Sequence, residues 1–153
     1  MYELLKYIHI VAAIVWLGGA VTSQLFALRA VASKDPTDLA RMGRIIEYVG
    51  LRVFFPAAIV LFIAGVIMTI QRWSFAQAWI SIAILLWLAS VLVGALYLGP
   101  NARKTSELFE AEGPTSEAAR ARMMRGFFIS RLELVSFAVI VALMVFKPGA
   151  GAA

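Results

Sequence analysis

The residue of this sequence best suited to chemistry is its single histidine. His9 lies seven residues before Trp16, which is followed by Gly18 and Gly19. On a helix that spacing places His9 and Trp16 on one face, together with several small residues. Small residues let the backbone of a neighbouring membrane helix come close, so this face is expected to point into a bundle. An ionisable side chain in such a place is a candidate functional site.

Two methionines are expected at the level of His9. Met68 lies near the end of the second apolar segment and Met144 near the end of the fourth. A neutral imidazole with a thioether is a known axial pair for haem, and the two groups could also bind copper. The candidate cofactor is therefore haem or porphyrin, bound by His9, Trp16, Met68 and Met144. Alternatively, His9 hydrogen-bonds a carbonyl or hydroxyl group and both methionines only pack. With one His and no Cys, no multi-residue metal site is predicted.

A second polar group is predicted near the opposite boundary of the apolar segments. Glu133 and Arg131 are two residues apart and cannot face each other on a helix, so we expect Arg52 to pair with Glu133. Such a pair would specify helix register more than it would add stability. The alternative is that Glu133 handles a proton or a substrate. The full predicted cluster is Gln24, Arg52, Tyr97, Asn101, Arg131 and Glu133.

The composition indicates which elements position these residues. The chain has 153 residues, of which 62% are hydrophobic and 15% charged, and it has no Cys. Soluble domains are about 45–50% apolar and about 25% charged, and a small bundle in water could not hide this much apolar surface. A soluble enzyme, a disordered chain and a secreted disulfide framework are thereby excluded. The sequence predicts an integral membrane protein with the lipid bilayer as its surroundings.

Stretches without charge give the membrane spans. Crossing a ~30 Å hydrocarbon core takes about 20 helical residues, which predicts helices at about 4–28, 53–71, 78–100 and 127–146 in one domain, 1–153. The long unbroken runs do not alternate as β-barrel strands do. The predicted fold class is an all-α four-helix membrane bundle. At ~1.5 Å per residue, His9 and Glu133 lie inside opposite boundaries, so two separate sites are expected.

Basic residues are concentrated in two connections. Residues 29–52 and 101–126 hold ten Lys and Arg side chains, against three on the opposite side. By the positive-inside rule both connections are cytoplasmic and both termini lie outside, with no cleaved signal peptide. The acidic residues mixed into these connections argue against nucleic-acid binding.

Both basic connections are expected to be helical. Asp35 can cap a helix that begins at Pro36. After Gly113, either Thr115 or Ser116 can cap another. We expect these helices to prolong the second and fourth spans beyond the membrane.

Several motifs carry a resemblance to known families. They are His9-Ile10 with Trp16 and Gly18-Gly19, Arg52-Val53-Phe54-x-Pro56, Leu98-Gly99-Pro100-x-x-Arg103, Ser130-Arg131-Leu132-Glu133, and Val145-x-Lys147-Pro148-Gly149. Over nearly its whole length the chain resembles a domain-of-unknown-function family of predicted integral membrane proteins of bacteria. That resemblance implies the architecture and a bacterial inner-membrane location, but no activity.

A more distant resemblance rests on fewer residues. His9, Trp16 and the frame of Glu133 with Lys147-Pro148 are similar to the membrane domain of copper-resistance protein D and to HemJ-type protoporphyrinogen oxidases, which are small four-helix haem-binding proteins. The oxidases carry further His and Lys residues near the third helix, and residues 73–97 contain neither.

No motif assigns a catalytic residue. The sequence has no P-loop, GxGxxG, HExxH or nucleophile elbow. Three classes of function are open. The chain could bind haem or porphyrin at His9, serve as a non-catalytic structural or accessory membrane subunit that binds a partner or its own copy, or act as a small copper or solute transporter in an oligomer.

Overall fold

The computed structural model describes residues 1–33 and 35–150, so Lys34 of the first basic connection lies outside the described residues. This part of the chain is helical and contains no strand. Its elements are α1 (Tyr2–Ser33), α2 (Pro36–Val49), the π-helical turn η1 (Gly50–Phe54), α3 (Phe55–Arg72), α4 (Ala78–Val93), the π-helical turn η2 (Gly94–Leu98), α5 (Gly99–Glu112) and α6 (Glu117–Phe146).

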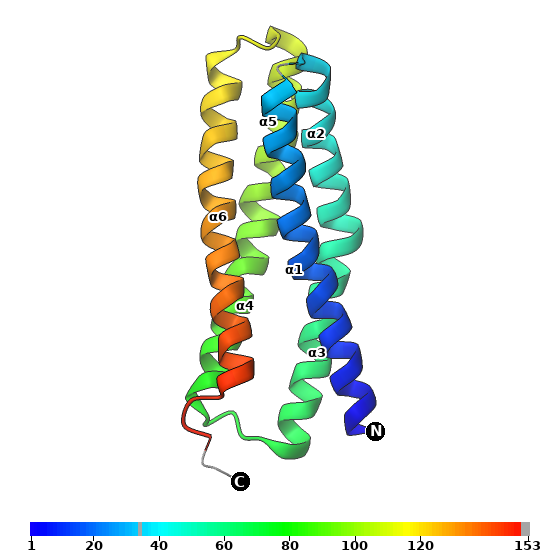
Figure 1. The fold of residues 1–153 in the computed structure, drawn as a ribbon, viewed down its shortest axis with the longest axis vertical. Helices are drawn as coiled ribbons and strands as arrows, with labels where there is room; N and C mark the ends of the chain where they lie inside the picture. The colour runs from blue at the N-terminus through cyan, green and yellow to red at the C-terminus, as the bar shows by residue number, and fades with distance from the viewer. Residues whose placement is uncertain (34, 151–153) are drawn as a thin grey trace.

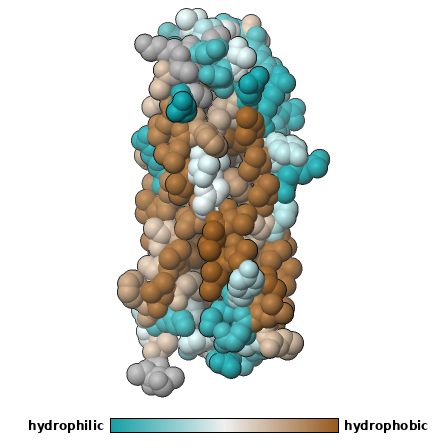
Figure 2. All heavy atoms as spheres, turned by 45° about the vertical axis from the view of Figure 1, so that its right-hand side comes forward, coloured by the Kyte–Doolittle hydropathy of each residue, from teal (hydrophilic) through white to brown (hydrophobic). Residues whose placement is uncertain are grey.

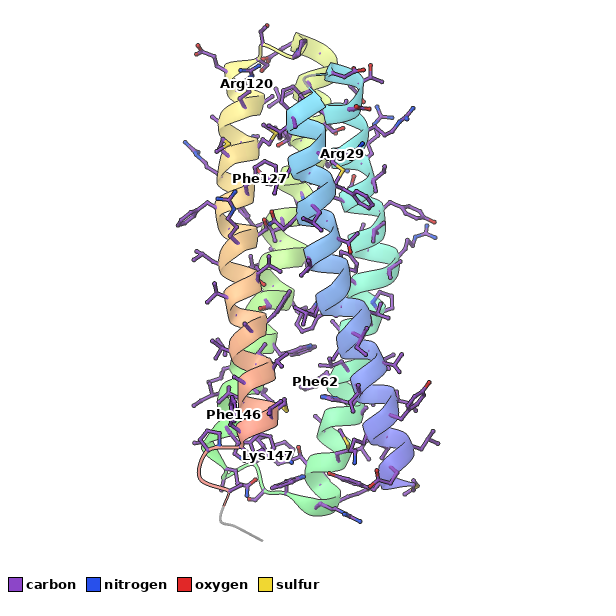
Figure 3. All side chains as sticks on the ribbon, in the orientation of Figure 1. Arg29, Phe62, Arg120, Phe127, Phe146 and Lys147 are labelled. Atoms are coloured by element: carbon purple, nitrogen blue, oxygen red, sulfur yellow. The ribbon has the colours of Figure 1, made fainter. Side chains whose placement is uncertain are left out.

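The elements form four long antiparallel rods, which are α1, α2–η1–α3, α4–η2–α5 and α6 in chain order. Both termini lie at the same end of the bundle (Figure 1). We call this the terminal end and the opposite end, formed by α2 and α5 with the flanking parts of α1 and α6, the extended end. Figure 3 shows Arg29 and Arg120 in the half nearer the extended end and Lys147 at the terminal end.

Four helical segments are long and apolar enough to cross a membrane. They are Tyr2–Arg29, Thr37–Arg72, Ala78–Glu112 and Glu117–Phe146. Figure 2 shows a broad apolar band between hydrophilic ends on one face of the bundle. The predicted all-α four-helix membrane bundle is confirmed.

Both predicted helix starts are also confirmed. Asp35 caps α2 by accepting a hydrogen bond from the backbone N–H of Thr37 at 2.8 Å, and Pro36 is the first helical residue. Ser116 caps α6 by accepting from the N–H of Ala119 at 3.2 Å. Side-chain acceptors satisfy N–H groups that the first helical turn leaves without partners.

The third rod extends further than predicted. The sequence predicts an end near residue 100 because the charge-free run stops before Arg103. The structure instead continues through α5 to Glu112. In η2 the N–H of Gly99 bonds the carbonyl of Gly94, five residues earlier, and Pro100 lies in the first turn of α5, where no N–H is required.

The second rod also contains a π-helical turn followed by a proline, at the corresponding position. In η1 the N–H of Phe55 bonds the carbonyl of Gly50, and Pro56 follows. Gly50 and Pro56 have the same spacing as Gly94 and Pro100. The two π-helical turns contact each other. Both rods therefore change their winding at the same level of the bundle, and π-helical turns of this kind are frequent at functional sites.

The helices pair differently in the two halves of the bundle. Near the extended end α2 packs along α5, and near the terminal end α1 packs along α3 and α4 along α6. Ser106 of α5 donates a hydrogen bond to the carbonyl of Ala40 in α2, which holds these two backbones close together. In the middle, Ala12, Ala58, Leu61 and Trp87 form a buried cluster that joins three of the rods.

Candidate functional site

The His9 side chain of α1 lies against the backbone of α3. Its Nδ1 is 2.8 Å from the carbonyl oxygen of Leu61. A carbonyl oxygen can only accept, so Nδ1 must carry the hydrogen and donate it. In the neutral ring Nε2 then keeps its lone pair and is the nitrogen able to accept a hydrogen bond or bind a metal. The half-buried imidazole is thus held in one tautomer by the neighbouring helix.

Gly65 makes room for this ring. A Cβ atom at position 65 would lie 3.1 Å from Cε1 of His9 and 3.3 Å from its Nδ1. Gly65 is one helical turn after Leu61, so both face the same side of α3 as His9 approaches. The close approach depends on the missing side chain.

Trp16 connects α1 to α6 and packs against the central cluster that includes Leu61. Its ring lies 4.5 Å, centroid to centroid, from that of Phe137. His9 lies seven residues before Trp16 on α1, and Met144 lies seven residues after Phe137 on α6. Because α1 and α6 are antiparallel, Met144 is therefore at the height of His9. Met68 lies three residues beyond Gly65, about one turn nearer the terminal end.

The six residues of the second predicted cluster are distributed over separate contacts. Gln24 of α1 donates to the hydroxyl of Ser130 in α6. Asn101 of α5 exchanges hydrogen bonds with Arg122. Tyr97 is half-buried in η2, and Arg131 is exposed.

The structure does not bring Arg52 and Glu133 together. The guanidinium of Arg52 lies 5.7 Å from the ring centroid of Tyr48 in its own rod. Ion pairs within residues 1–33 and 35–150 join Lys6 to Glu3, Arg44 to Glu110 and Arg103 to Glu107. The carboxyl group of Glu133 instead lies near the hydroxyl of Ser90 in α4.

Sequence reasoning overlooked three serines that matter here. Ser130, Glu133 and Ser136 recur every three residues on α6, which places them near one face of the helix. Ser90 faces them from α4 and lies 3.4 Å, oxygen to oxygen, from Ser136. This i, i+3, i+6 pattern could have been read from the sequence, whereas the facing Ser90 depends on helix register.

Aromatic and cationic side chains close the terminal end, in what we call the terminal clasp. The ammonium of Lys147 lies 4.6 Å from the ring centroid of Trp73, and the guanidinium of Arg72 lies 4.3 Å from that of Tyr2. The indole N–H of Trp73 donates to the hydroxyl of Tyr2 at 3.2 Å. Trp73 also meets Trp79 edge to face at 5.3 Å. The clasp therefore ties α1, the α3–α4 turn and the end of α6 together.

Two shallow surface grooves are formed by helix pairs of the bundle. One, of about 500 Å³, is lined by α2 and α5 together with Gly113 and Pro114, and includes Arg41 and Arg44. The other, of about 260 Å³, is an apolar groove between α1 and α3 that includes Tyr7 and Val60. His9 and Glu133 line neither groove.

Comparison with known proteins identifies the family. The family model described as "Predicted integral membrane protein (DUF2269)" matches residues 3–148. No curated protein and no solved structure matches the chain, so the similarity to copper-resistance protein D and to the oxidases is not shown by comparison. The family match spans nearly the entire chain and agrees with the four apolar helices. The chain therefore belongs to the DUF2269 family of predicted integral membrane proteins.

Proposed function

We propose that this protein binds haem or porphyrin in the terminal-end half of the bundle, with Nε2 of His9 as the ligand atom. The hydrogen bond from Nδ1 to the carbonyl of Leu61 carries the proposal. Histidines that bind metals almost always donate their other ring N–H to a carboxylate, a backbone carbonyl or water, which fixes the tautomer and the ring orientation. His9 has this arrangement within an apolar span.

Flat aromatic surfaces near the middle of the bundle support the same proposal. The rings of Phe62 and Trp87 stack 4.2 Å apart, and Figure 3 shows Phe62 between the α1–α3 pair and the α4–α6 pair. A porphyrin inserted between these pairs would contact the two rings. Met144, at the height of His9 on α6, would be the candidate second axial ligand, and Met68 the alternative one.

The test is the absorption spectrum of the purified protein. We expect a Soret band after purification or after titration with haemin, and we expect His9→Ala to lower haem affinity at least tenfold. Met144→Leu should shift the band if Met144 is the second ligand. Tyr7→Ala, an exposed position on the same helix, is the matched control. Colourless protein that takes up no haem would contradict the proposal.

The second candidate function is a structural or accessory subunit. The hydrogen bond between His9 and the carbonyl of Leu61 also supports this function. Because His9 already has a partner on α3, the ring can join two helices without any ligand. In that case His9→Ala would lower the melting temperature and leave no spectral change. A homo-oligomer or a membrane partner protein should then be detected by cross-linking and co-purification from the native membrane.

We also propose that the bundle lies in a bacterial inner membrane with both termini outside and the extended end in the cytoplasm. The excess of Lys and Arg in the two connections supports this orientation. The chain has no Cys, so a single introduced thiol reports its side of the membrane. Glu3→Cys should react with an impermeant thiol reagent in spheroplasts, and Thr115→Cys only after lysis. The reverse pattern would refute the orientation.

A further inference from the structure

Most glycines inside the helices are explained by close packing, but three are not. A Cβ atom would collide with another helix at four positions, which are Gly19, Gly43, Gly65 and Gly126. At Gly18, Gly50 and Gly94 a Cβ atom would meet nothing within 4 Å. Glycine inside a helix is less favourable than alanine, so these three positions call for a different reason.

The three unexplained glycines lie at one level of the bundle. Gly50 begins η1 and Gly94 begins η2, and the two π-helical turns contact each other. The ring of Phe54 in η1 lies against Gly19, the residue after Gly18 in α1. Gly50 (φ −55°, ψ −50°) and Gly94 (φ −60°, ψ −51°) have ordinary helical backbone angles, so backbone conformation does not require glycine there either.

This level of the bundle is built to bend. Sharp bends of helices occur at glycine, at proline and at π-helical turns. The second rod combines all three in Gly50, η1 and Pro56, and the third rod combines them in Gly94, η2 and Pro100. Both rods can therefore change direction at the same level, and α1 has its glycine beside them.

Beyond this level the terminal half consists of two helix pairs, α1 with α3 and α4 with α6 (Figure 1). Aromatic side chains join the pairs in the middle, where Trp16 packs on Phe137 and Phe62 stacks on Trp87. At the end of the bundle Trp73 connects α1 to α6, because it contacts both Tyr2 and Lys147. Side-chain contacts of this kind can separate without unfolding either pair.

The extended half is held more firmly. Ser106 of α5 donates a hydrogen bond to the carbonyl of Ala40 in α2. A Cβ atom at Gly43 of α2 would lie 2.6 Å from the carbonyl oxygen of Ala102 in α5, so the two backbones are in direct contact. The paired helices α2 and α5 therefore provide a fixed base for movement of the terminal half.

We propose that Gly18, η1 and η2 form a hinge, about which the α1–α3 pair and the α4–α6 pair separate between α1 and α6 in the terminal half. The terminal clasp holds the closed arrangement. The movement needs no ligand. Under the proposed function, on which this last step rests, the opening is the path by which the tetrapyrrole reaches His9 from the bilayer.

Distances between spin labels test the hinge, because the chain has no cysteine of its own. Tyr7→Cys with Val145→Cys reports on the terminal half, and Leu28→Cys with Met124→Cys is the matched pair in the extended half. All four positions are exposed, and both pairs join α1 to α6 at matching heights in the register of Trp16 with Phe137. In lipid nanodiscs we expect two distances for the first pair and one for the second. A single distance for both pairs, or two for both, would overturn the hinge.

Two kinds of variant should shift the longer distance in opposite directions. The double variant Gly50→Ala, Gly94→Ala should lower its share about fivefold, because alanine favours the straight helix at each position. Trp73→Ala should raise its share about threefold, because the contacts of the clasp are lost. Leu51→Ala, an exposed position of η1 that keeps Gly50, is the control and should change nothing. If the glycine variant matches Leu51→Ala, η1 and η2 are not the hinge.

The rate of haemin uptake tests the opening as the path of the ligand. We expect the Gly50→Ala, Gly94→Ala variant to develop its Soret band at least threefold more slowly than the unchanged protein, and to reach the same final absorbance. An unchanged rate would refute this path. Absence of haem uptake by the unchanged protein would contradict the proposed function but not the hinge, which the label distances decide.

Discussion

His9 and Glu133 show two ways of accommodating an ionisable side chain in apolar surroundings. His9 donates to a backbone carbonyl on a neighbouring helix, and the carboxyl group of Glu133 lies near the hydroxyl of Ser90. Within residues 1–33 and 35–150, neither side chain takes part in an ion pair. For His9, one ring nitrogen is satisfied and the other is left for a ligand or water.

Substitution of Gly65 tests how closely His9 depends on α3. In Gly65→Ala the new methyl group would lie 3.1 Å from Cε1 of His9, so the ring must shift and its bond to Leu61 is strained. We expect a loss of about 1–3 kcal/mol, as for overpacked cores, measured by thermal unfolding in detergent. Gly18→Ala meets no atom within 4 Å and is the control. Equal stability of the two variants would contradict the tight contact.

At the scale of elements, the sequence predicts what depends on local chemistry. Charge-free runs locate the four spans, and Asp35 with Pro36 and Ser116 mark two helix starts. The sequence does not predict that the third rod continues through Pro100. The π-helical turn that accommodates the proline depends on packing beside η1, which local sequence does not give.

The candidate sites were only partly predictable for a related reason. His9 was identifiable by type and spacing, but its partner is a backbone carbonyl, which every residue carries. The expected Arg52–Glu133 pair rested on the position of Arg52 at the start of the second predicted span. Arg52 lies inside η1, where a wider turn changes the direction of its side chain relative to α3. Facing residues such as Ser90 follow from helix register, which local spacing does not give.

The start of α6 offers a test at this scale. In Ser116→Ala the N–H of Ala119 loses its side-chain acceptor, and we expect a loss of about 1 kcal/mol together with faster amide hydrogen exchange in the first turn of α6. Thr115→Ala removes an exposed hydroxyl that caps nothing in the structure and should leave both measurements unchanged. If the two variants exchange at the same rate, Ser116 is not the effective cap.

For the molecule as a whole, the two helix pairs of the terminal half are joined at their middle and at their end. Trp87 of α4 donates to the carbonyl of Ala58 in α3 at 3.2 Å, and Trp16 packs on Phe137. At the end of the bundle the terminal clasp provides the remaining link. These contacts therefore link all four rods in the terminal half.

Loss of the clasp should loosen the entire terminal half. Trp73→Ala removes the contact with Lys147, the hydrogen bond to Tyr2 and the edge-to-face contact with Trp79. Cation–π contacts contribute about 0.5–1 kcal/mol each at exposed sites. We expect a melting temperature lower by several degrees and faster hydrogen exchange near both termini. Phe75→Ala, which changes an exposed aromatic residue in the same turn, should have little effect. An unchanged melting temperature in Trp73→Ala would mean that the clasp does not stabilise the bundle.

The length of the second rod has a consequence for anything that approaches the bilayer. Thr37–Arg72 comprises 36 helical residues, about 54 Å at 1.5 Å per residue, whereas the hydrocarbon core is about 30 Å thick. Roughly 20 Å of this rod, and a similar length of the third, therefore projects beyond the hydrocarbon core as a rigid helical extension. A water-soluble protein that approaches this face would contact the end of the extension before it could contact the lipid headgroups.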